Sequence, residues 1–204
     1  NAQDLSNNLW ASATLQDLAP EVLTTVPALS RYIPGNVGEM KAQEVSNSLW
    51  AAAKLKDAVP EVLAAVPALA ERIPSLAKYM IPQALSNSLW AVAKLQDDVP
   101  DVLMAVSALA EHIPRKVQDI CPQDLSNNLW AAAKLQDAAP EVLKAVPSIA
   151  ANIPGNVEGM EFQEVSNSMW AATKLQYAVP ETLKAVPALA ERLKRCHASA
   201  YLAW

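Results

Sequence analysis

Cysteine and histidine are scarce, with two of each among 204 residues. They are Cys121, Cys196, His112 and His197, and they lack the clustered C-x-x-C or H-x-x-x-H spacing of structural zinc sites. We therefore expect no metal, no cofactor and no disulfide framework. Cys196 and His197 are adjacent, but consecutive side chains on a helix point about 100° apart, so this pair does not suggest an activated nucleophile.

Long apolar runs are also missing. Hydrophobic residues make up 52% of the chain, yet no run approaches the ~20 residues of a membrane span. We therefore expect a soluble protein without membrane insertion. The net charge of -5 gives no general attraction to nucleic acid, so a site for a polyanion must be local. The chain starts at Asn1 without a signal-peptide pattern, so we expect a processed product or a fragment.

The sequence repeats itself every 40 residues without an insertion or a deletion. The copies span residues 2–41, 42–81, 82–121, 122–161 and 162–194, followed by a divergent tail, 195–204. They share the core Q-[DEA]-[LV]-S-N-[NS]-[LM]-W-A-x-[AT]-[KT]-L. Copies one and four resemble each other most, as do copies two and five. This 120-residue super-repeat indicates duplication of a three-copy block, and we expect the chain to be a piece of a longer array.

Each copy is predicted to form two helices. In copy two, apolar residues recur at helical spacing over 43–56, and a second helix is expected from Pro60 through Ile73. A proline inside the second helix, such as Pro67, should kink or split it and could create a third short helix. The equivalent residues are Pro27, Ser107, Pro147 and Pro187.

A later proline in each copy is predicted to end the second helix. These residues are Pro34, Pro74, Pro114 and Pro154, with Gly35 and Gly155 reinforcing the turn. A single helix pair cannot bury its own apolar faces, whereas stacked copies share a continuous core. The sequence therefore predicts an all-α fold, an α-solenoid in which five two-helix repeats form one superhelical array.

One face of the first helix is polar. On a helical wheel, Gln43, Asn47 and Lys54 lie within about 40° of one another with Trp50 at their edge, opposite Val45 and the other apolar residues. We call this repeated set the polar stripe. It comprises Gln3, Asn7, Gln43, Asn47, Lys54, Gln83, Asn87, Lys94, Gln123, Asn127, Lys134, Gln163, Asn167 and Lys174, flanked by Trp10, Trp50, Trp90, Trp130 and Trp170.

Each member of the polar stripe has a structural and a functional interpretation. The tryptophans could fill the seam between copies, the asparagines could bond the neighbouring copy, and the lysines could be plain solvated residues. Alternatively, amides read base edges, aromatic rings stack on bases and lysine pairs with phosphate, which together suit single-stranded RNA. An extended peptide is the competing ligand, because amides also bond a peptide backbone.

The segment N-x-x-W-A-x-A-K-L, as in residues 47–55, resembles the octotricopeptide repeat of algal and protist organelles. This resemblance covers nearly the whole chain. It implies an array of helical hairpins that binds single-stranded RNA in a plastid or mitochondrion, with roles in transcript stability, processing or translation. It implies no enzymatic activity.

We accordingly expect a non-catalytic RNA-binding array, and as the alternative a protein-binding scaffold or subunit of an organellar assembly. The stripe barely varies between copies, which fits a homopolymeric or low-specificity RNA and also a structural role. The tail carries Tyr201, Leu202 and Trp204, which we expect to cap the last apolar face.

Overall fold

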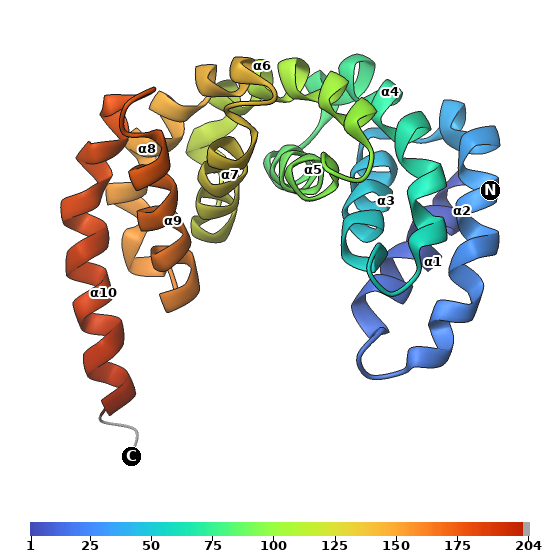
Figure 1. Cartoon of the computed structure of the whole chain (residues 1–204), viewed down its shortest axis with the longest axis horizontal. Helices are drawn as coiled ribbons and strands as arrows, with labels where there is room; N and C mark the ends of the chain where they lie inside the picture. Colours follow the sequence, from blue (N-terminus) through green and yellow to red (C-terminus); the bar gives the residue numbers. More distant parts are fainter. Residues whose placement is uncertain (202–204) are drawn as a thin grey trace. The chain divides into compact units, whose positions relative to one another are not determined.

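The computed structural model describes residues 1–201, with the side chains of residues 1–196. Within that range the chain is all-α, and each 40-residue copy supplies a first and a second α-helix (Figure 1). The first helices are α1 (Ala2–Leu15), α3 (Ala42–Leu55), α5 (Pro82–Leu95), α7 (Pro122–Leu135) and α9 (Phe162–Leu175). The second helices are α2 (Val26–Asn36), α4 (Val66–Leu76), α6 (Val106–Lys116), α8 (Val146–Asn156) and α10 (Val186–Tyr201).

Short 3₁₀ helices connect these elements. One precedes each second helix: η1 (Pro20–Thr25), η3 (Pro60–Ala65), η5 (Pro100–Ala105), η7 (Pro140–Lys144) and η9 (Pro180–Ala185). Another follows the first four second helices: η2 (Val37–Glu39), η4 (Ala77–Tyr79), η6 (Val117–Asp119) and η8 (Val157–Gly159). No helix within residues 1–201 has the length and apolar character needed to cross a bilayer.

The predicted split of the second helix is confirmed. The 3₁₀ helix η3 begins at Pro60 and ends at Ala65, and α4 then starts at Val66 with Pro67 in its first turn. A proline is compatible with this position because the first N–H groups of a helix have no partner within the helix. Pro67 therefore suits the start of the α-helix but does not alone determine it, because α6 starts at the equivalent Val106 with Ser107 in place of the proline.

The prediction that the later prolines end the second helix is wrong. Pro34, Pro74, Pro114 and Pro154 all lie inside α-helices, and Gly35 and Gly155 follow within the same helices. A proline near the end of a helix removes only one backbone hydrogen bond. Leu69, Ala70 and Ile73 of α4 are fully buried, and this burial outweighs the local penalty.

The chain divides into two compact units, residues 1–109 and residues 110–204. In the first unit α1 packs on α3 and α3 on α5, while α2 packs on η3 and α4 on η5. In the second unit α7 packs on α9, α8 packs on η9, and α10 lies beside α9 (Figure 1). In each unit, therefore, a helix contacts the equivalent helix of the next copy, as in an α-solenoid.

The predicted apolar face of the first helix forms the core. Val45, Leu49, Ala52 and Leu55 of α3 have no solvent exposure. Because that face is packed, the opposite side of each first helix carries the polar stripe.

Candidate functional site

The polar stripe lies at the surface of both units. All five of its glutamines and all four of its lysines are exposed. Asn7 is exposed, and the asparagines of the four later copies are half-buried. Since α1, α3 and α5 pack side by side in the first unit, and α7 and α9 in the second, the stripe residues form rows across neighbouring helices.

The tryptophans lie between core and solvent. Trp50, Trp90 and Trp130 are half-buried, whereas Trp10 and Trp170 are 45% and 36% exposed. All five tryptophan side chains are therefore partly exposed and partly buried. A packing role and a stacking role for these rings therefore both stay predictions.

A lysine of the polar stripe lies over each central tryptophan. The Nζ atom of Lys54 is 5.7 Å from the ring centroid of Trp50, and Lys94 repeats this contact with Trp90 at 5.6 Å. The four-residue spacing produces the contact, because residues i and i+4 lie on the same side of a helix. A cation–π contact at an exposed site stabilises by about 0.5–1 kcal/mol. In copy one the equivalent Thr14 donates a hydrogen bond to the carbonyl of Trp10 instead.

In the second unit a lysine also reaches the next copy. The Nζ atom of Lys134 lies 5.8 Å from the ring centroid of Trp130 and 5.3 Å from that of Trp170. One ammonium group thus lies near two indoles on α7 and α9. Cation and aromatic surface are therefore adjacent along the stripe.

In copy two, two amides of the polar stripe interact within their own helix. The Nε2 group of Gln43 donates to Oδ1 of Asn47 at 3.2 Å, again over a four-residue spacing. This bond orients the asparagine amide so that its NH₂ group is left to donate elsewhere.

A serine that the sequence interpretation missed makes hydrogen bonds between the first helices of neighbouring copies. Ser6 donates to the carbonyl of Glu44 at 3.0 Å, and Ser46 donates to the carbonyl of Ala84 at 2.8 Å. Ser126 repeats this with Glu164 at 2.8 Å. The signal in the sequence was the serine that precedes the asparagine in every copy. Serine is unfavourable in the middle of a helix unless its hydroxyl has a hydrogen-bond partner.

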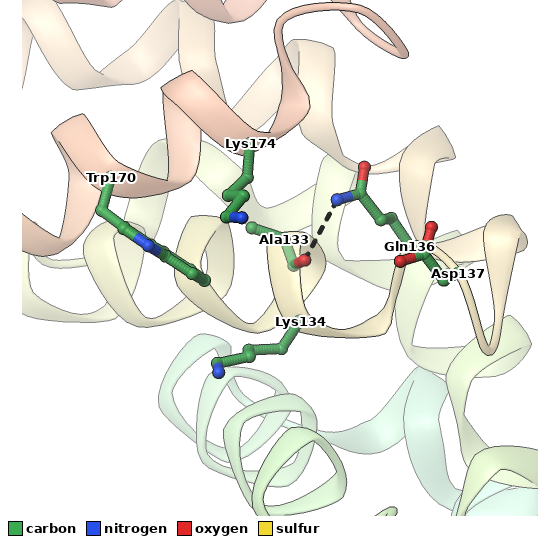
Figure 2. A pocket seen from close by; sticks show the side chains of 6 residues that line it. All are labelled: Ala133, Lys134, Gln136, Asp137, Trp170 and Lys174. Carbon is green, nitrogen blue, oxygen red and sulfur yellow. Dashed lines mark hydrogen bonds between the residues drawn. The ribbon is translucent and has the colours of Figure 1, made fainter.

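The second unit contains an open hollow of ≈ 240 Å³ beside the polar stripe. Ala133, Lys134, Gln136, Asp137, Trp170 and Lys174 line it. Figure 2 shows Trp170 at one end, Gln136 and Asp137 at the other, and the two lysines between them. The hollow thus combines an aromatic surface, two cations and a group of hydrogen-bond acceptors.

Two titratable groups with a shifted pKa, Cys121 and Asp124, lie at the start of α7, away from the lysine end of that helix. Burial raises the pKa of the Asp124 carboxyl, which is only 6% exposed, and a hydrogen bond with Cys121 opposes this shift. Desolvation also raises the pKa of the Cys121 thiol, which disfavours a reactive thiolate. The His197 side chain, and with it the Cys196–His197 pair, lies outside the described residues.

Among the described residues, no group of three or more histidine, cysteine, aspartate or glutamate side chains could hold a metal ion. Comparison of the chain with protein-family models, curated proteins and solved structures finds no match. What is established is therefore a helical-repeat protein whose family is not identified.

Proposed function

We propose that each unit binds single-stranded RNA along its polar stripe and catalyses no reaction. The observation that carries this proposal is the recurrence of one surface set, Gln, Asn, Trp and Lys, on the exposed side of first helices that pack side by side. Neighbouring helices pack ~8–10 Å apart, so equivalent side chains form lines suited to an extended strand.

The chemistry of the set matches the parts of a nucleotide. An indole that is partly exposed can stack on a base, which contributes about 1–3 kcal/mol per base in proteins that bind single strands. A lysine beside the ring can move its ammonium group onto the phosphate of the same nucleotide. The exposed glutamine and the oriented asparagine amide can contact base edges, which are accessible only in single-stranded RNA.

The resemblance to octotricopeptide repeats supports the same ligand. That resemblance rests on N-x-x-W-A-x-A-K-L, and its asparagine, tryptophan and lysine are the residues found together on the exposed face. On this basis we further propose a location in a plastid or mitochondrion and a role in transcript stability, processing or translation.

The proposal is tested by removing the stripe lysines. Lys54, Lys94 and Lys134 are changed together to Gln, and binding of labelled homopolymer RNAs is measured over a range of salt concentrations. Each phosphate contact contributes about 0.7 to the slope of log K against log salt for single strands. We expect weaker binding to every RNA and a slope that falls by up to about 2 units.

A matched control carries the same change of charge elsewhere. Lys78, Lys144 and Lys184 are exposed and lie on the 3₁₀ helices η4, η7 and η9. Changing these three to Gln should leave the salt slope close to that of the intact chain. If both triple variants lose the same amount of binding, the stripe is not the RNA site.

A protein ligand is the second candidate, and the charge balance favours it. The chain carries 21 acidic and 16 basic residues, so a long RNA meets general repulsion outside the stripe. A peptide backbone would use the amides of Asn47, Asn87 and Asn127 instead. In that case changing these asparagines to Ala abolishes binding, whereas the lysine changes and the salt concentration have little effect.

A further inference from the structure

An aspartate follows the polar stripe at the end of each of the first four first helices. These residues are Asp17, Asp57, Asp97 and Asp137, with Tyr177 in copy five. All four are exposed. A carboxylate just after the last turn of a helix meets the negative end of the helix dipole, which is unfavourable. Helix stability therefore does not explain why aspartate recurs there.

Turn formation does not explain it either. Aspartate suits turns when its carboxylate accepts a local hydrogen bond. Within the described part of the chain, Asp57, Asp97 and Asp137 make no hydrogen bond or ion pair with protein. The carboxylates are directed to solvent beside a row of lysines, where a carboxylate weakens attraction for any polyanion. A compensating contact with the ligand would account for this cost.

The hollow of the second unit indicates which contact this is. In Figure 2 the aromatic ring of Trp170, the ammonium groups of Lys134 and Lys174, and the oxygen atoms of Gln136 and Asp137 follow one another in that order. A single strand can match these groups with a base over the ring, the phosphate that follows that base's own ribose at the ammonium groups, and the ribose of the next nucleotide at the acceptors. Lys134 is exposed, so its ammonium group can shift from the ring of Trp170 to a phosphate.

We propose that Asp137 selects RNA over DNA by accepting a hydrogen bond from a ribose 2′-hydroxyl. This inference rests on the proposed function, since it assumes that the stripe binds a single strand. The 2′-hydroxyl is the group that distinguishes RNA from DNA at a protein site. A carboxylate is a strong acceptor for it, because hydrogen bonds to charged groups are stronger than neutral ones.

Gln136 supports Asp137 as a second acceptor. Its Nε2 group donates to the carbonyl of Ala133 at 3.3 Å, and this bond fixes the amide with its Oε1 atom available. The end of the hollow away from Trp170 is therefore rich in acceptors and matches a hydroxyl donor. DNA has no hydroxyl there, so it meets the repulsion between carboxylate and phosphate without a compensating bond. Asp57 and Asp97 are expected to act in the same way in the first unit.

The test compares RNA and DNA pools of the same random sequence, about 20 nucleotides long, at fixed salt concentration. A pool with 2′-fluoro sugars, which lack the donor, is measured alongside them. For the intact chain we expect RNA to bind at least about tenfold more tightly than either of the others, the ratio that one charge-assisted hydrogen bond supplies.

The Asp57→Asn, Asp97→Asn and Asp137→Asn triple variant should reduce that ratio to about threefold or less, mainly because DNA now binds more tightly. The matched control makes the same change of charge on the neighbouring 3₁₀ helices with Glu61→Gln, Asp101→Asn and Glu141→Gln. It should keep the ratio of the intact chain.

The outcomes separate the two proposals. If the intact chain binds neither RNA nor DNA, the proposed function fails. If it binds RNA and DNA equally, or if the aspartate variant keeps the full RNA preference, the stripe binds nucleic acid but Asp137 is not the selecting residue.

Discussion

Two serines of α3 offer a controlled measurement of the hydrogen bonds between copies. Ser46 and Ser48 are both fully buried and lie two residues apart. Ser46 donates to the carbonyl of Ala84 in the next copy at 2.8 Å. The Ser48 hydroxyl has no hydrogen-bond partner among the described residues. The two positions thus differ mainly in whether the hydroxyl is paired.

Alanine at either position gains helix propensity, about 0.5 kcal/mol, and this gain cancels in the comparison. Ser46→Ala loses a hydrogen bond with a net value of about 1 kcal/mol, so it should lower the free energy of unfolding by about 0.5 kcal/mol. Ser48→Ala removes a buried hydroxyl that lacks a partner, so it should raise that free energy by about 1–2 kcal/mol.

Urea denaturation measures this difference. With an m value of about 2 kcal/mol/M, the midpoints of the two variants should differ by about 1 M. The two midpoints should lie on opposite sides of the midpoint of the intact chain. Equal shifts in the same direction would refute the role of Ser46 as a bond between copies.

Three further predictions concern Trp90, Asp124 and the ion pair of Lys56 with Asp98. Trp90→Ala should lower the free energy of unfolding by about 1–3 kcal/mol, less than for an enclosed indole, as measured by urea denaturation. Asp124→Asn should raise the melting temperature at neutral pH. Burial raises the pKa of this carboxyl in the folded state. The contribution of Asp124 to stability therefore falls as the pH rises above 3.8, the ordinary pKa of the group. Below pH 3.8 the intact chain and the Asp124→Asn variant should melt at the same temperature. Lys56 and Asp98 each depart from the repeat, and they form an ion pair at 2.5 Å. A double-mutant cycle that introduces the residues of other copies, Lys56→Gln and Asp98→Ala, should give a coupling free energy of about 0.5–1 kcal/mol between the two positions. A coupling free energy of zero would show that the ion pair contributes nothing to stability.

The apolar pattern predicted the core because burial follows helical spacing directly. Val45, Leu49 and Leu55 face inward, and Gln43 and Lys54 face outward, as the helical wheel indicated. The same wheel placed Trp50 at the edge of the polar stripe, and its half-buried position agrees with this. Local periodicity was therefore sufficient for the faces of the first helix.

The prolines show where local rules are insufficient. Pro67 and Pro74 have the same local chemistry, yet Pro67 lies in the first turn of α4 and Pro74 lies inside that helix, where it does not end it. The difference depends on the burial of Leu69 and Ile73 against other helices, which no single segment reveals. The serine bonds were missed for a related reason, since Ser46 bonds a carbonyl 38 residues away. The proposed capping by Tyr201, Leu202 and Trp204 concerns side chains outside the described residues.

Photocrosslinking of bound RNA, followed by mass spectrometry of the crosslinked peptides, tests the central claim most directly. We expect crosslinks on the first helices, at peptides that contain Trp50, Trp90, Trp130 or Trp170, and few on α2, α4 or α8. Crosslinks concentrated on the second helices, or no RNA bound even at low salt concentration, would contradict it and favour a protein ligand.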